Sequence, residues 1–84
     1  MRKILVTGAL GQIGSELSLE LRKIYGADNV IASSRRKKEG QEEVIESGPF
    51  EIVEVTNAQQ LAEVVKKHKV NTIIHLAALL SAEG

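Results

Sequence analysis

Residues 4–14 decide the fold and read Ile-Leu-Val-Thr-Gly-Ala-Leu-Gly-Gln-Ile-Gly. The first four residues form an apolar run that ends at a glycine, which is typical of a strand buried on both faces of a parallel sheet. The last three open a segment, residues 12–25, in which apolar side chains recur at helical spacing. A glycine-rich turn therefore joins a buried strand to a helix.

The three glycines of this turn suggest a phosphate-binding loop. Gly8 would allow a tight turn off the strand, Gly11 would let the backbone approach a pyrophosphate, and Gly14 would let the helix pack closely. The phosphates would face the free N–H groups of the first helical turn, around Gln12 and Ile13. A structural loop that happens to be glycine-rich is the alternative. The position between a strand and an amphipathic helix favours the dinucleotide site.

Strand-like and helix-like segments alternate along the rest of the chain. We expect strands at residues 3–7, 29–33 and 50–55, and a fourth within 70–77 that is centred on residues 72–74. Helices are expected at 12–25 and 57–68, with one helical turn at 42–46 in an exposed connection. Such alternation predicts a parallel sheet, and right-handed crossovers give it the strand order 3-2-1-4. The fold class is therefore α/β, a Rossmann-like half domain with helices on both faces.

Spacing within the helical segments assigns their faces. Apolar residues recur at intervals of four, four and three in the first helix, which places one buried stripe at Ile13, Leu17, Leu21 and Ile24. Arg22 falls on the side expected to face solvent. Gly26 is suited to end this helix. Asn57, with Gln60 three residues later, is expected to cap the second helix.

Composition limits the classes of function. Eleven basic and eleven acidic residues cancel, so there is no overall charge to attract nucleic acid or an anionic membrane. No cysteine is present, which excludes disulfides and thiolate metal sites and fits a cytoplasmic protein. The longest apolar stretch, residues 72–80, is about half the length that a membrane helix needs. We expect one domain, residues 1–84.

The glycine spacing is Gly-x-x-Gly-x-x-Gly, one residue wider than in most dinucleotide folds, and it resembles the extended short-chain dehydrogenase/reductase superfamily, which includes NAD-dependent epimerases and dehydratases. Residues 48–51 (Gly-Pro-Phe-Glu) and 75–82 (His-Leu-Ala-Ala-Leu-Leu-Ser-Ala) are similar to the L-threonine 3-dehydrogenases of that superfamily. The resemblance implies the cofactor-binding part of a longer oxidoreductase. There are two alternatives. The chain could be a standalone binding or self-assembly module, or it could be part of a nucleotide-sugar epimerase or dehydratase.

The end of the second strand bears on the choice of dinucleotide. An NAD-binding domain usually places an acidic residue there, on the ribose hydroxyls. This chain has Ser34, followed by Arg35 and Arg36, and guanidinium groups pair well with a 2′-phosphate. NADP is therefore favoured over NAD. A solvated basic run, balanced by the glutamates downstream, is the alternative, and Lys37 and Lys38 are assigned to it.

The ends of the last two strands supply the remaining candidate contacts. Glu54 and Val55 would border the adenine. Leu76, Ala77 and Ala78 would lie against the cofactor's phosphate and ribose, where small side chains permit close approach. Simple packing explains these alanines equally well.

No catalytic or metal-ligating residue is assigned. The family resemblance implies a tyrosine with a lysine four residues later, but Tyr25 is the only tyrosine and is followed at that spacing by Asn29. The resemblance therefore places the active tyrosine beyond this length, and it matches Ser81 to a serine near the substrate pocket. His68 and His75 have no second ligand at a suitable spacing and are more typical of packed or surface histidines.

The fourth strand would leave a hydrophobic sheet edge in a chain of this length. Unpaired edges invite pairing with another chain. We therefore expect self-association through this edge.

Overall fold

The computed structural model describes residues 2–37, 39–54 and 56–76. Its elements lie close to the expected ranges, although the third strand is shorter and a 3₁₀ turn, η1, was not expected. In chain order they are β1 (Ile4–Thr7), α1 (Gln12–Tyr25), η1 (Ala27–Asn29), β2 (Val30–Ser34), α2 (Glu42–Glu46), β3 (Phe50–Ile52), α3 (Ala58–His68) and β4 (Thr72–His75).

The four strands form one parallel sheet in the order β3-β2-β1-β4, as the sequence predicts. β1 is central: Val6 pairs with Ala32 of β2 on one side and with Ile74 of β4 on the other. All four residues of β1 are buried, which explains why its sequence is an unbroken apolar run up to Thr7. Strand order reverses beside β1, so the switch point lies between β1 and β4.

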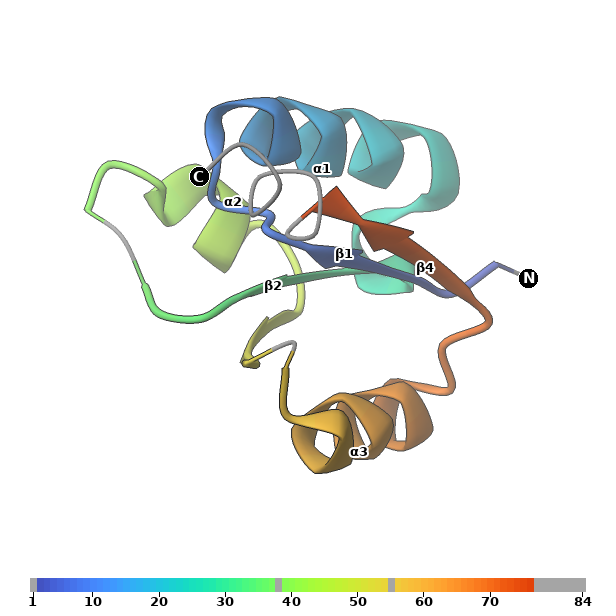
Figure 1. Ribbon diagram of the computed structural model, residues 1–84. Coiled ribbons are helices and arrows are strands. Elements are labelled where there is room, and N and C mark those ends of the chain that lie inside the picture. Colours follow the sequence, from blue (N-terminus) through green and yellow to red (C-terminus); the bar gives the residue numbers. More distant parts are fainter. Residues whose placement is uncertain (1, 38, 55, 77–84) are drawn as a thin grey trace.

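Helices cover both faces of the sheet, as expected (Figure 1). Successive residues of β1 point to opposite faces of the sheet and belong to two separate hydrophobic cores. Val6 and Val30 belong to a cluster that includes Val44 of α2, while Leu5 and Ile31 pack with Val64 of α3. α1 and α2 therefore lie on one face, and α3 covers the other.

The face of α1 that meets the sheet differs from the expected apolar stripe. Ile13 and Ile24 are each 66% exposed, whereas the buried positions of the helix are Gly14, Ser18 and Arg22. The small residues Gly14 and Ser18 let the helix axis approach the sheet. The two ends of the expected apolar stripe, Ile13 and Ile24, therefore face solvent. The assignment of the stripe was wrong at both of its ends because periodicity records apolar residues and overlooks small ones.

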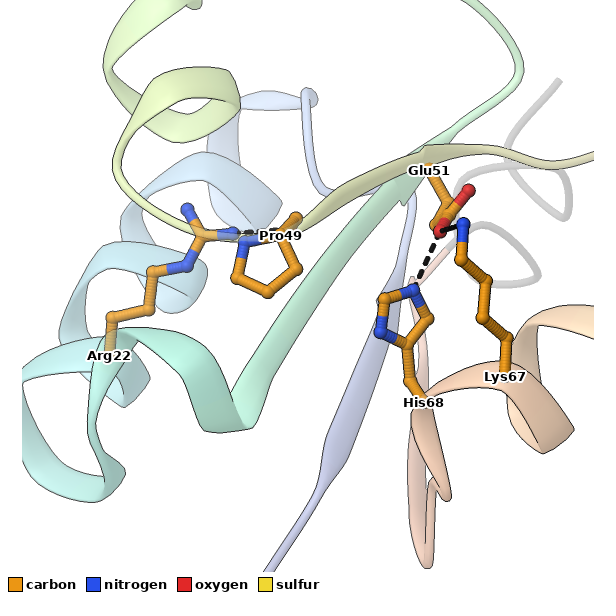
Figure 2. A network of polar contacts seen from close by, with 5 residues as sticks. All are labelled: Arg22, Pro49, Glu51, Lys67 and His68. Carbon is orange, nitrogen blue, oxygen red and sulfur yellow. Dashed lines mark hydrogen bonds and ion pairs between the residues drawn. The ribbon is translucent and has the colours of Figure 1, made fainter.

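Arg22 was expected to face solvent and is instead buried, at 6% exposure. Its guanidinium donates to three backbone carbonyls and one hydroxyl. Nε donates to Val30 O at 3.2 Å, and Nη1 donates to Val44 O and, at 2.9 Å, to Ser47 Oγ. Nη2 donates to Pro49 O at 2.7 Å (Figure 2). These acceptors come from β2, α2 and the loop before β3, so one side chain joins all three to α1.

The burial of this cation is stabilised by backbone dipoles. Val44, whose carbonyl accepts from Nη1, lies in the last turn of α2, where helix carbonyls lack partners and carry partial negative charge. Burial lowers the pKa of Arg22. Gly48 is required beside it, since a Cβ there would lie 2.6 Å from Arg22 Nε and 2.8 Å from Ala27 O.

A second polar contact joins β3 to the end of α3. Glu51 Oε2 lies 2.6 Å from His68 Nε2 and 3.0 Å from Lys67 Nζ (Figure 2). Burial raises the pKa of Glu51, but the hydrogen bonds and charges of His68 and Lys67 together outweigh it. The pKa of Glu51 therefore lies below its ordinary value of 4.5.

We expect Arg22→Met to lower the free energy of unfolding by about 1–3 kcal/mol, because it leaves buried carbonyls without donors. Urea denaturation measures this change. Lys23→Met is the matched control, since the Lys23 side chain is 77% exposed and its ion pair with Glu20 spans 3.9 Å. That variant should differ from the wild type by less than about 0.5 kcal/mol. Equal stability of the two variants would contradict the role given to Arg22.

We expect the stability contributed by Glu51 to depend on pH. A carboxyl group whose pKa is lowered by folding stabilises the protein above its unfolded pKa, and that contribution is lost as the pH falls through the folded pKa. Wild type should therefore exceed Glu51→Gln in unfolding free energy above pH 4.5, and the difference should shrink below it. In a Lys67→Met background the difference should be smaller throughout. A difference that stays constant from neutral pH down to about pH 3 would refute the assignment.

Candidate dinucleotide site

The glycine turn between β1 and α1 is held by backbone hydrogen bonds. Gly8 has a φ of 70°, a left-handed conformation that glycine adopts at little cost, as expected for a tight turn off the strand. Gly11 N–H donates to Gly8 O at 3.2 Å, and Ala9 N–H donates to Ser33 O of β2 at 2.9 Å. The turn is therefore closed on itself and tied to the neighbouring strand.

Gly14 allows α1 to contact this turn directly. A Cβ at Gly14 would lie 2.1 Å from Gly8 O and 2.9 Å from Ala9 Cα, both of which are backbone atoms that have no room to move. The expected close packing at Gly14 is confirmed, but its partner is the turn itself. Any side chain here would push the helix away from the loop that precedes it.

The amino end of α1 is open to an anion. Gly11 is the N-cap, no side chain caps the helix, and no acidic residue lies in its first turn. Gln12 and Ile13 are both exposed. The first N–H groups of a helix have no partner within it, and the helix dipole makes this end positive. A pyrophosphate oxygen is the kind of acceptor that suits these groups.

The end of β2 lies beside the turn. Ser34 is half-buried, and its carbonyl accepts a hydrogen bond from Val53 N–H at 2.9 Å. Arg35 and Arg36 are exposed, and neither forms an ion pair with another described residue. Their guanidinium groups are thus accessible at the end of the strand.

The loop after β3 is shaped by a network of polar contacts. Glu54 Oε1 accepts from Thr56 Oγ1 at 3.2 Å, and Glu54 N–H donates to Gln60 Oε1 at 3.0 Å. Gln60 N–H in turn donates to Asn57 Oδ1 at 3.1 Å, which confirms the expected cap of α3. Val55 lies outside the described residues. Gln60 was not foreseen as a support for this loop, since its reach back to Glu54 depends on the loop conformation.

The segment after β4 is described only in part. Leu76 is half-buried and packs against the core cluster under α1. Ala77, Ala78 and Ser81 lie outside the described residues. Packing accounts for Leu76, and its expected contact with a cofactor stays a prediction.

One pair at the switch point was missed from the sequence. Thr7 Oγ1 lies 2.9 Å from His75 Nδ1, joining the last residues of the two strands that flank the switch point. The two are 68 positions apart, so only the strand register brings them together. Thr7 immediately precedes Gly8, and this adjacency was the available signal.

The described residues contain no group of three or more His, Cys, Asp or Glu side chains placed to hold a metal ion. None of the helices they form is long and apolar enough to cross a membrane.

Comparison with known proteins agrees with this geometry. The model of the NAD dependent epimerase/dehydratase family matches residues 4–84. An epimerase/dehydratase of Staphylococcus haemolyticus is 49% identical over 82 residues, which are 98% of this chain and 26% of that protein.

Solved structures give the same result. The L-threonine dehydrogenase from Clostridium difficile is 63% identical with a TM-score of 0.84, over 89% of this chain and 23% of that one. The dTDP-glucose 4,6-dehydratase from Bacillus anthracis, solved in complex with NAD, is 26% identical with a TM-score of 0.75, over 89% of this chain and 26% of that one.

The chain belongs to the NAD dependent epimerase/dehydratase family, because the family model covers nearly all of it. It spans about a quarter of the length of the relatives that it matches.

Proposed function

We propose that residues 1–84 form the nicotinamide dinucleotide-binding part of an oxidoreductase that resembles L-threonine 3-dehydrogenase. The observation that carries this proposal is the uncapped amino end of α1, held against the turn by the contact of Gly14 with Gly8. In this proposal the pyrophosphate accepts hydrogen bonds from the N–H groups around Gln12 and Ile13. The adenosine half lies toward the ends of β2 and β3, bordered by Glu54 and Val55.

We propose further that the 2′-phosphate of NADP is preferred at the end of β2. The description of the family, and the Bacillus anthracis relative solved with NAD, favour NAD. The residues of this chain favour NADP, because Ser34 carries no charge to repel a phosphate, and exposed Arg35 and Arg36 can pair with one. We give the positive charges of Arg35 and Arg36 more weight than the family's name, because they would act directly on the 2′-phosphate, the group that distinguishes NADP from NAD.

For the whole protein we propose the dehydrogenation of a small substrate that carries a hydroxyl group. We also propose that the protein is cytoplasmic. The bound cofactor would supply hydride transfer. This chain's own residues would bind and orient the dinucleotide. The 63% identity to a threonine dehydrogenase favours that activity. The likeness to dTDP-glucose 4,6-dehydratase, at 26% identity, supports a nucleotide-sugar enzyme as the second candidate.

Titration with NADPH and NADH, followed by cofactor fluorescence, tests the binding site. We expect saturable binding, tighter for NADPH. Gly11→Val should weaken it by about tenfold or more, because the new side chain would occupy the space of the phosphates. The fold should persist, since Gly11 has a φ of −74° and a ψ of 172°, values that any residue adopts. Ala62→Val, on an exposed position of α3, is the control and should bind as the wild type does.

Charge reversal in the same titration tests the preference. Arg35→Asp should weaken NADPH binding by about tenfold and leave NADH nearly unchanged. Lys37→Asp makes the same change of charge outside the proposed site and should have little effect. If Gly11→Val leaves affinity unaltered, the ligand binds elsewhere. If Arg35→Asp does not alter the ratio of the two affinities, the preference for NADP is wrong.

We also propose self-association through the edge of β4. In support, β4 pairs only with β1 among the described strands, and Ile73 is 46% exposed. Unpaired strand edges with apolar side chains favour pairing between chains.

Sedimentation velocity at micromolar concentration tests this association, and we expect a dimer. Ile73→Lys should yield a monomer, because a charged residue on an edge strand opposes pairing. Ile24→Lys is the matched control, since Ile24 is also exposed but lies at the end of α1. A compact, folded wild-type monomer would refute the proposal.

A further inference from the structure

We infer that His75 is a positioning residue for the glycine turn and acts on it through Thr7. The inference rests on the proposed function, because it concerns the affinity of the same dinucleotide site. His75 is not part of the glycine motif and lies 61 positions after its last glycine, Gly14.

The contact itself places His75 next to the turn. Thr7 is fully buried and is followed directly by Gly8, whose left-handed φ begins the turn. Thr7 Oγ1 lies 2.9 Å from His75 Nδ1 and, at 3.4 Å, from Ile74 O. The hydroxyl of the last residue of β1 is thus directed toward β4. It fixes the point from which the turn departs.

The strand register shows that this level of the sheet is built differently from the level before it. His75 pairs with Thr7, Thr7 with Ser33, and Ser33 with Glu51, so polar residues occupy one row across all four strands. The preceding row on the same face is apolar, with Ile73, Leu5 and Ile31.

Hydrogen bonds from this polar row hold the turn from two sides. On the β2 side, Ser33 O accepts from Ala9 N–H at 2.9 Å, and Ser33 Oγ donates to Val6 O at 2.9 Å. On the β4 side, Thr7 Oγ1 contacts His75 Nδ1 at 2.9 Å and Ile74 O at 3.4 Å. Removing the His75 side chain therefore takes away the shorter of these two contacts of the Thr7 hydroxyl, while the bonds to β2 remain.

The switch point is where a dinucleotide crosses the sheet in this class of fold. The contact between Thr7 and His75 joins the residue before the glycine turn to the carboxyl end of β4. Small displacements of the backbone N–H groups that bind a ligand reduce affinity strongly, because these groups must point at the phosphate oxygens. His75 thus affects affinity without contacting the phosphates.

Two substitutions of similar size separate this role from simple packing. Leu and Asn have nearly the same shape, but only Asn can place a donor or an acceptor where His Nδ1 lies. Affinity is measured at a temperature where each variant is fully folded, with whichever of NADPH and NADH the wild type binds more tightly. We expect His75→Leu to weaken binding about five- to tenfold and His75→Asn to stay within about twofold of the wild type.

A double-mutant cycle assigns the effect to Thr7. Thr7→Val removes the hydroxyl and keeps the shape of the side chain, and Thr7→Val with His75→Leu should be no weaker than either single variant by more than about twofold. His68→Leu is the control, because it breaks the contact with Glu51 at the other edge of the sheet. It should lower stability in urea and leave affinity unchanged.

The outcomes distinguish the two proposals. A wild type that binds neither cofactor overturns the proposed function and this inference with it. A wild type that binds, while His75→Leu binds equally well, overturns the inference alone. Equal losses in His75→Leu and His75→Asn, or losses that simply add to that of Thr7→Val, also overturn it.

Discussion

The approach of α1 to the turn after β1 is the constraint on which the rest of the site depends. The helix backbone contacts the turn at Gly14, where even one methyl group would overlap Gly8 O. This contact leaves the first helical N–H groups facing outward at the carboxyl edge of the sheet. The proposed pyrophosphate site therefore depends on packing and backbone groups rather than on a charged side chain.

The far end of the same helix is fixed by the opposite means. At Gly14 a side chain is missing, whereas at Arg22 a long side chain fills the interior and is satisfied by carbonyls from β2, α2 and the loop before β3. A buried cation without a carboxylate is costly unless every donor finds an acceptor. Gly48 makes the room for it. Contacts near both ends of α1 therefore fix its position against the sheet.

Local patterns in the sequence predicted the elements, the strand order and the glycine turn. β1, the turn and α1 are contiguous, and each is specified by its own residues. Two of the failures involve contacts between distant positions, and a third concerns the composition of a helix face. Arg22 looks like a solvent-facing residue of a helix because its acceptors lie at residues 30–49. Thr7 and His75 meet only through the strand register, and the buried face of α1 is marked by small residues that periodicity does not count.

The central place of β1 has a consequence for how the chain acquires its structure. Ile4 pairs with Val30 and with Thr72, so β1 is completed by β4, which is synthesised after all the other described strands. Closing the longer of these connections costs more chain entropy and gives the fold a high contact order. Until residue 75 has been synthesised, the edge of β1 that faces away from β2 stays unpaired. Nascent chains are therefore most prone to aggregate during this interval.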